Sequence, residues 1–170
     1  MVYIALGAAV LLIAADQLLK YLVLEGLTKV VTLPLIQDVL HLTYVENRGA
    51  AFGIFQGQRW LLIGVTSAVL LGITVYLLMG KIKDKIPVWG TALILAGGAG
   101  NLIDRATRGF VVDYVDFRLI NFYVFNLADA CVCVGVGLVI LYLLILEPLA
   151  LKRKKHSDEA APDGGNSEQV

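Results

Sequence analysis

The acidic and amide side chains between residues 97 and 129 are the part of this sequence whose types and spacing could do chemistry. Asn101 and Asp104 are spaced i, i+3, and Asn126 and Asp129 repeat that spacing, which places amide and carboxylate on one helical face. Two aspartates held close together cannot both ionise readily, so one keeps a proton while the other stays charged. Such a pair can activate water against a peptide carbonyl. The aspartates available for this chemistry are Asp104, Asp113, Asp116 and Asp129.

Other hydrolytic chemistries lack the residues that they need. The only histidines are His41 and His156, and no His-Glu-x-x-His helix is present to bind zinc. The serine within an apolar segment, Ser67, has no lysine on the same segment. The sequence therefore disfavours serine, cysteine and zinc hydrolysis, and it predicts carboxylate chemistry with no metal and no cofactor.

The elements that must position these carboxylates are predicted to be membrane-spanning helices. The chain is 58% apolar and 16% charged, with a mean hydropathy of +0.78, which is too hydrophobic for an ordinary soluble domain. Segments long enough to cross a hydrocarbon core of about 30 Å occur at residues 2–24, 60–79, 86–103 and 125–146. The sequence predicts an all-α membrane protein with four transmembrane helices.

A small β segment is expected between the first two helices, within residues 25–59. Leu40, Leu42 and Tyr44 alternate there with other side chains as in a half-buried strand. We expect residues 1–151 to form one domain. Residues 152–170 begin with basic residues and continue with almost nothing apolar, so we expect them to form a disordered tail.

The basic residues predict the orientation in the membrane. Lys81, Lys83 and Lys85 lie in the loop between the second and third segments, and residues 152–155 follow the last one. The positive-inside rule then places both termini in the cytoplasm. Counting along each helix puts the acidic cluster near the outer leaflet. A carboxylate at membrane depth costs roughly 2.5 to 3.5 kcal/mol, so such residues usually mark function.

Several of these polar and small residues also have structural interpretations. Asp16 and Lys20 are spaced i, i+4 in the favourable order, which predicts a neutralising ion pair that supports the structure. Asn101 and Asn126 taken alone are typical helix caps. Asp129 does not fit a cap, because apolar residues continue from it to Leu146. Residues 97–100 are small and favour close helix packing.

Five motifs, in chain order, resemble those of the lipoprotein signal peptidases, the type II signal peptidases of bacteria. They are Asp16-Gln17 with Lys20, Asn47-x-Gly49-Ala50-Ala51-Phe52, Gly97 through Asn101-Leu-Ile-Asp104-Arg105, Gly109-Phe-Val-Val-Asp113-Tyr and Phe125-Asn126-Leu-Ala-Asp129. The resemblance implies an intramembrane aspartic endopeptidase of the cell (inner) membrane, without a cofactor. Its substrates would be diacylglyceryl-modified prolipoproteins, cut before the lipidated cysteine. We expect a monomer among membrane lipids, with no nucleic-acid partner.

The resemblance also implies roles for individual residues. Helical spacing alone would pair Asp104 with Asp129, whereas the family's catalytic pair falls on Asp113 and Asp129. Asp116, three residues beyond Asp113, is expected to lie in a loop as a solvated surface charge. The residues that correspond to substrate-binding or supporting positions are Asn47, Asn101, Asp104, Arg105 and Asn126.

A proton- or ion-coupled small membrane carrier is the chief alternative, because transporters also hold acids within the membrane. Carriers usually place these acids near the midplane between repeated halves, whereas no paired halves are visible here. A purely structural four-helix protein is a third possibility. It would need more basic partners at membrane depth than Lys20 and Arg105.

Overall fold

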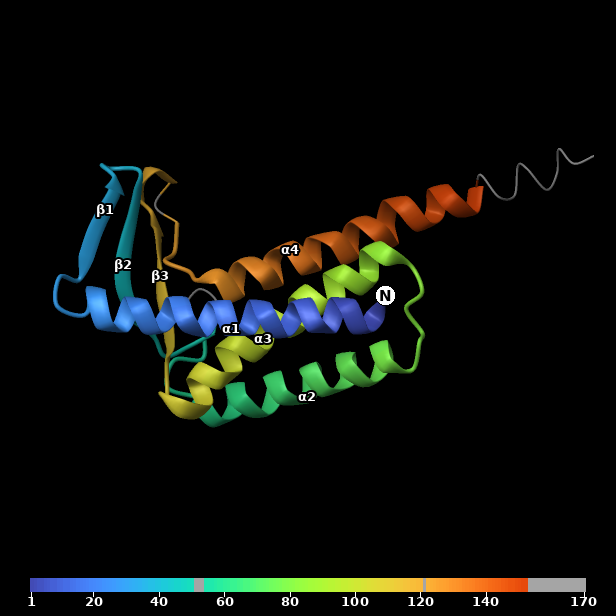
Figure 1. Cartoon of the computed structure of the whole chain (residues 1–170), viewed down its shortest axis with the longest axis horizontal. Helices are drawn as coiled ribbons and strands as arrows, with labels where there is room; N and C mark the ends of the chain where they lie inside the picture. The colour runs from blue at the N-terminus through green and yellow to red at the C-terminus, as the bar shows by residue number, and fades with distance from the viewer. Residues whose placement is uncertain (51–53, 121, 153–170) are drawn as a thin grey trace, which may run out of the picture.

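Four long helices and a small sheet make up the computed structural model, which describes residues 1–50, 54–120 and 122–152. The helices are α1 (Val2–Leu27), α2 (Arg59–Leu78), α3 (Lys85–Thr107) and α4 (Leu127–Leu141), and α4 continues through a π-helical turn (η3, Tyr142–Leu146). Each of the four is long and apolar enough to cross a membrane, the fourth when it is followed through to Lys152. The predicted four-helix membrane architecture is confirmed (Figure 1).

Two helix boundaries differ from the prediction in ways that matter for the site. α3 extends to Thr107 rather than to residue 103, so Asp104 and Arg105 lie inside its last turns. α4 begins at Leu127 rather than at residue 125, because Asn126 is extended and caps the helix. Ala51 and Phe52 of the second motif, and the tail from residue 153 on, lie outside the described residues.

A three-stranded antiparallel sheet lies across one end of the helices (Figure 1). Its strands, in spatial order, are β1 (Thr32–Ile36), β2 (Leu40–Asn47) and β3 (Val111–Phe117). The first two confirm the β segment between the first two helices. β3 was not predicted, and it carries Asp113 opposite Val45 of β2.

The half-buried strand predicted around residue 42 is confirmed as β2. Its apolar residues, however, are not the most buried ones. Leu42 and Tyr44 pack against the end of α1, beside Val23 and Leu27. The most buried side chain of the strand is nevertheless His41, with 4% of its surface exposed. Residues on both faces of β2 are buried or half-buried, Glu46 excepted. The alternation of apolar and polar residues therefore does not mark one solvated face.

The small residues of α3 allow its close contacts with α4 and α1. A Cβ atom added at Gly97 would lie 2.1 Å from the carbonyl oxygen of Ala128, and one at Gly100 would lie 2.6 Å from a carboxylate oxygen of Asp16. This confirms the packing role predicted for residues 97–100. Away from the sheet, the apolar core joins α1, α2 and α3 through Ala5, Ala9, Leu77, Val88, Ala92, Leu95 and Ala96.

Candidate active site

The strand β3 and the start of α4 bring Asp113 beside Asn126. Phe125 pairs with Val115 in an isolated antiparallel bridge, so the chain returns alongside β3 just before α4 begins. The amide nitrogen Nδ2 of Asn126 then donates to Oδ1 of Asp113 at 2.6 Å. Asp113 is 2% exposed. The strand that sequence reasoning missed is therefore the element that positions this carboxylate.

Asp129 is held at the start of α4 by a capping box with Asn126. The backbone N–H of Asp129 donates to Oδ1 of Asn126 at 2.9 Å, and the backbone N–H of Asn126 donates to Oδ2 of Asp129 at 3.1 Å. The interpretation that Asp129 does not take part in a cap was wrong. A capping box uses the third residue of a helix, so it is compatible with the apolar run that follows.

Two further amides complete the hydrogen bonds to these carboxylates. Nδ2 of Asn101 donates to Oδ1 of Asp129 at 2.7 Å. Nδ2 of Asn47 donates to Oδ2 of Asp113 at 3.0 Å. Among the described residues, each of the four carboxylate oxygens of Asp113 and Asp129 thus accepts one hydrogen bond and keeps one lone pair for another partner.

Lys20 is linked to Asp129 through Asn101. The predicted ion pair between Lys20 and Asp16 is confirmed. The side chain of Lys20 is fully buried, and Nζ is 2.9 Å from Oδ2 of Asp16 and 2.9 Å from Oδ2 of Asp104. Nζ also donates to Oδ1 of Asn101 at 2.9 Å. Since Asn101 donates in turn to Asp129, a continuous chain of hydrogen bonds joins the buried ammonium to that carboxylate.

Asp104 organises the turn between α3 and β3. Besides Lys20 it binds the guanidinium of Arg108, and its Oδ2 accepts the backbone N–H of Val112 at 3.2 Å. Val112 immediately precedes Asp113. Asp104 therefore holds the start of the strand that carries the first carboxylate of the pair.

The surroundings of Asp113 favour its protonated form. Burial, and then the nearby charge of Asp129, raise the pKa of Asp113 to about 7, although hydrogen bonds from Asn47 and Asn126 act in the opposite direction. Two coupled acids of this kind can share one proton near neutral pH. Within the described part of the chain, no three His, Cys, Asp or Glu side chains are grouped so as to hold a metal ion.

Arg105 lies beside the pair and has donor capacity left over. One terminal nitrogen donates to the carbonyl oxygen of Gly49 at 2.8 Å. Its charge interacts with Asp129, Asp113 and Asp104. Nε of Arg105 is buried and has no hydrogen-bond partner among the described residues.

Asp116 lies in β3 and not in a loop, contrary to the prediction. Its side chain is 13% exposed and its Oδ2 accepts hydrogen bonds from Thr43 at 2.7 Å and from Arg118 at 3.0 Å. Burial alone would raise the pKa of Asp116, but these hydrogen bonds hold it below its usual value. Asp116 thus joins neighbouring strands of the sheet.

Sequence reasoning missed Arg108 and Arg59, and it gave no role to Gln17, which is part of the first motif. Gln17 donates to Oδ1 of Asp104 at 3.2 Å, and Arg108 binds both Gln17 and Asp104. The i, i+4 spacing of Asp104 and Arg108 could have indicated that ion pair. Arg59 donates to carbonyl groups at the end of α3, and no local sequence pattern predicts that contact.

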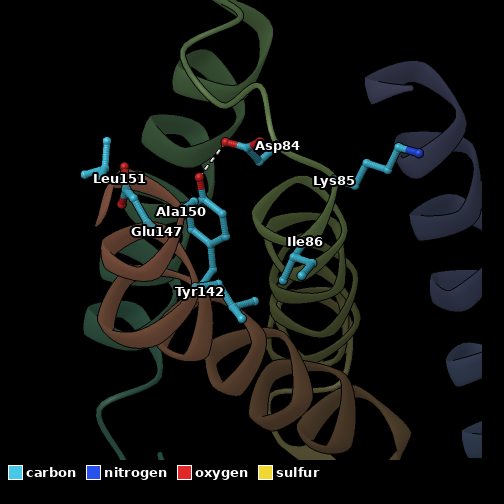
Figure 2. A pocket seen from close by; sticks show the side chains of 8 residues that line it. Asp84, Lys85, Ile86, Tyr142, Glu147, Ala150 and Leu151 are labelled. Carbon is cyan, nitrogen blue, oxygen red and sulfur yellow. Dashed lines mark hydrogen bonds between the residues drawn. The ribbon is translucent and has the colours of Figure 1, made fainter. Parts of the chain in front are cut away.

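A pocket at the opposite end of the helices contains none of these residues. It measures about 860 Å³ and is lined by side chains from the start of α3 and the end of α4 (Figure 2). Tyr142 donates to Asp84 there. With a rise of about 1.5 Å per residue, the length of α3 separates this pocket from Asp104.

The sequence is similar to that of known peptidases. Residues 8–145 match the family model described as signal peptidase (SPase) II. The lipoprotein signal peptidase of Clostridioides difficile (strain 630) is 49% identical over 141 residues, which cover 81% of this chain and 93% of that protein. The lipoprotein signal peptidase of Bacillus subtilis (strain 168) is 39% identical over 139 residues, which cover 81% of this chain and 90% of that protein.

The fold is similar to that of solved bacterial membrane enzymes. A structure determined by the in meso method at 2.3 Å resolution has a TM-score of 0.76 and 27% identity, and the match covers 98% of this chain and 93% of that one. Another, determined at 1.9 Å resolution, has a TM-score of 0.72 and 31% identity, with 83% and 92% covered. The resemblance carried by the five motifs is confirmed, and the chain belongs to the signal peptidase II family.

Proposed function

We propose that this chain removes the signal peptide from diacylglyceryl-modified prolipoproteins, by cutting before the lipidated cysteine, with Asp113 and Asp129 as the water-activating pair. Its membership of the signal peptidase II family supports the reaction. The observation that carries the residue assignment is the position of Asn126, which donates to Asp113 and forms the capping box with Asp129. A single residue thus contacts both carboxylates.

The two carboxylates are suited to different roles in the resting enzyme. Asp129 lies in the first turn of α4, where a backbone N–H and the helix dipole stabilise a negative charge. The Lys20 ammonium donates to the amide oxygen of Asn101 and polarises that amide, whose nitrogen donates to the carboxylate of Asp129. The pKa of Asp113, raised to about 7 by burial and then by the charge of Asp129, favours its protonated form near neutral pH. We therefore assign Asp129 as the base and Asp113 as the acid.

This assignment gives a balanced reaction without a covalent intermediate. Asp129 accepts a proton from water as the water oxygen attacks the scissile carbonyl carbon, and Asp113 donates its proton to the carbonyl oxygen. When the resulting diol collapses, the carbon–nitrogen bond breaks. The leaving nitrogen takes the proton held by Asp129, and Asp113 recovers a proton from a diol hydroxyl. Both acids return to their starting states.

The neighbouring residues would support the pair in distinct ways. Asn47, Asn101 and Asn126 orient the carboxylates through their amide donors. Arg105, whose charge interacts with both carboxylates, would contact the substrate beside them. Asp104 would position Asp113 by accepting the backbone N–H of Val112, the residue before it.

Asp16 and Lys20 would stabilise the helices that carry the site rather than take part in the reaction. Oδ1 of Asp16 accepts the backbone N–H of Ala128 at 3.1 Å, which ties α1 to the first turn of α4. Lys20 neutralises Asp16 and Asp104 together.

The orientation in the membrane is also part of the proposal. The N-terminus and the last described turn of α4 lie at one end of the helices, and the sheet and the proposed pair lie at the other (Figure 1). Lys81, Lys83 and Lys85 lie at the first of these ends, which supports a cytoplasmic location for it. The pair would then face the outer leaflet of the bacterial cell membrane. We retain residues 1–151 as a monomeric peptidase domain among membrane lipids, followed by a cytoplasmic tail.

A cleavage assay in detergent tests this function. The purified protein is expected to cut a diacylglyceryl-modified prolipoprotein but not the same prolipoprotein without the lipid, and EDTA is expected to have no effect. Equal cleavage of both forms would contradict the substrate assignment. Activity that required added metal would contradict the two-acid mechanism. The family match does not favour the carrier alternative.

A further inference from the structure

Arg59 joins the start of α2 to the end of α3. Its Nε donates to the carbonyl oxygen of Arg105 at 2.7 Å, and a terminal nitrogen donates to the carbonyl oxygen of Ala106 at 2.8 Å. Carbonyl groups in the last turn of a helix have no partner within the helix, and a cation near that end interacts favourably with the helix dipole. One guanidinium thus satisfies two such carbonyls from a different helix.

The guanidinium of Arg59 is held in place from other directions. Its carbon atom lies 5.0 Å from the centre of the Trp60 ring. Gly109 turns the chain beside it with a φ of +86°, and a Cβ atom at that position would approach the guanidinium to 3.4 Å. The turn that leads from α3 to β3 therefore leaves room for this side chain.

The residue whose carbonyl Arg59 binds also sends a side chain toward the site. Arg105 donates to the carbonyl oxygen of Gly49, and its charge interacts with Asp113 and Asp129. Gly49 in turn donates its backbone N–H to Oδ1 of Asn47, the residue that binds Asp113. Contacts therefore run from Arg59 through the backbone and side chain of Arg105 to the segment that holds the carboxylate.

We propose that Arg59 is a positioning residue for the peptidase reaction, which fixes the last turn of α3 and thereby the guanidinium of Arg105. The proposal rests on the function proposed above. It differs from a general stabilising role because the effect of Arg59 on catalysis must pass through Arg105. Arg59 itself makes no contact with either carboxylate among the hydrogen bonds and ion pairs of the described residues.

The test is a double-mutant cycle measured as kcat/KM on the lipidated prolipoprotein. Because small misplacements of catalytic groups are costly, Arg59→Ala is expected to lower kcat/KM about 10- to 100-fold. Arg59→Lys should recover only part of this loss, since an ammonium cannot reproduce the planar fork across two carbonyls. In an Arg105→Gln background, Arg59→Ala should change kcat/KM about twofold or less. An equal loss in both backgrounds would overturn the proposal.

Arg118→Ala is the matched control, because Arg118 is also partly exposed and hydrogen-bonded but binds Asp116 and Thr32 away from the pair. Its kcat/KM should equal that of the parent protein. The melting temperature of each variant separates catalytic from folding defects.

Hydrogen exchange without substrate gives a second, independent measurement. Arg59→Ala should speed exchange in residues 103–107 and in residues 47–50, whereas Arg118→Ala should change neither segment. Unchanged exchange in residues 47–50 would overturn the proposal even if the protein had no activity. Failure of the parent protein to cut the lipidated prolipoprotein would instead count against the proposed function, and the exchange measurement would still decide the role of Arg59.

Discussion

Asn126 donates its amide to Asp113 at 2.6 Å and caps the helix that carries Asp129. The residue therefore has two separable tasks. Its Nδ2 atom donates to Asp113 and also to Asn101 and the carbonyl oxygen of Val112. Its Oδ1 atom accepts the backbone N–H of Asp129. Substitutions that keep one task and remove the other can distinguish catalytic support from helix stability.

Asn126→Ser is expected to keep the cap and lose the donor to Asp113. Serine is as good a capping residue as asparagine, so the helix cap is kept. The buried acceptors of Asn126 Nδ2 lose their donor, so the free energy of unfolding should fall by about 1 to 3 kcal/mol. The kcat should fall as well. Asn126→Ala should lose both functions and about 1 kcal/mol of stability in addition. Chemical denaturation and turnover of the lipidated prolipoprotein measure the two effects. A serine variant with full kcat would show that the amide donor is dispensable.

The pH dependence of activity should follow the protonation of Asp113. If Asp113 donates the first proton, kcat/KM should fall as the pH rises through about 7, because the acid is then ionised. Since paired acids titrate together, this value belongs to the coupled pair. Asp116→Asn should leave the profile unchanged, because Asp116 binds Thr43 and Arg118 instead. A flat profile from about pH 5 to 9, about two units on either side of the transition, would contradict the acid role.

The titration of Asp113 should also make the stability of the protein depend on pH. The folded state raises the pKa of Asp113 from 3.8 to about 7, so its protonated form is favoured on folding. The associated stability is present at pH values below 3.8 and is lost as the pH rises to about 7. Asp113→Asn removes this titration. Its melting temperature should therefore depend less on pH across that window than that of the parent protein.

Lys20 should be essential for folding because it is enclosed by two carboxylates. Lys20→Met leaves Asp16 and Asp104 buried without their shared cation, which is expected to cost about 3 to 5 kcal/mol. Adding Asp16→Asn should recover part of that loss by removing one of the two negative charges. Thermal denaturation in detergent measures both variants. If Lys20→Met were as stable as the parent protein, the ion-pair interpretation would be wrong.

Gly97 should tolerate no side chain. Its Cβ atom would lie 2.1 Å from the backbone oxygen of Ala128, so Gly97→Ala must separate α3 from α4 at the residue next to Asp129. We expect a loss of about 1 to 3 kcal/mol together with lower activity. Gly72→Ala is the matched control, since nothing lies within 4 Å of the added atom. Similar melting temperatures for the two variants would contradict the close packing.

Sequence patterns predicted the features that depend on residues close together in the chain. Runs of apolar residues predicted the four helices, and the i, i+4 spacing of Asp16 and Lys20 predicted their ion pair. β3 was missed because its stability depends on pairing with β2, which lies far away in the sequence. For the same reason helical spacing alone suggested Asp104 as the partner of Asp129. Only the family resemblance pointed to Asp113.

Cleavage of the lipidated prolipoprotein by Asp113→Asn and Asp129→Asn tests the central claim most directly. Each variant keeps the shape of the side chain but cannot exchange the proton that the reaction requires, so kcat should fall by about 10³-fold or more. Asp116→Asn, the matched substitution in the same strand as Asp113, should retain the activity of the parent protein. Full turnover by either Asp113→Asn or Asp129→Asn would contradict the assignment of the pair.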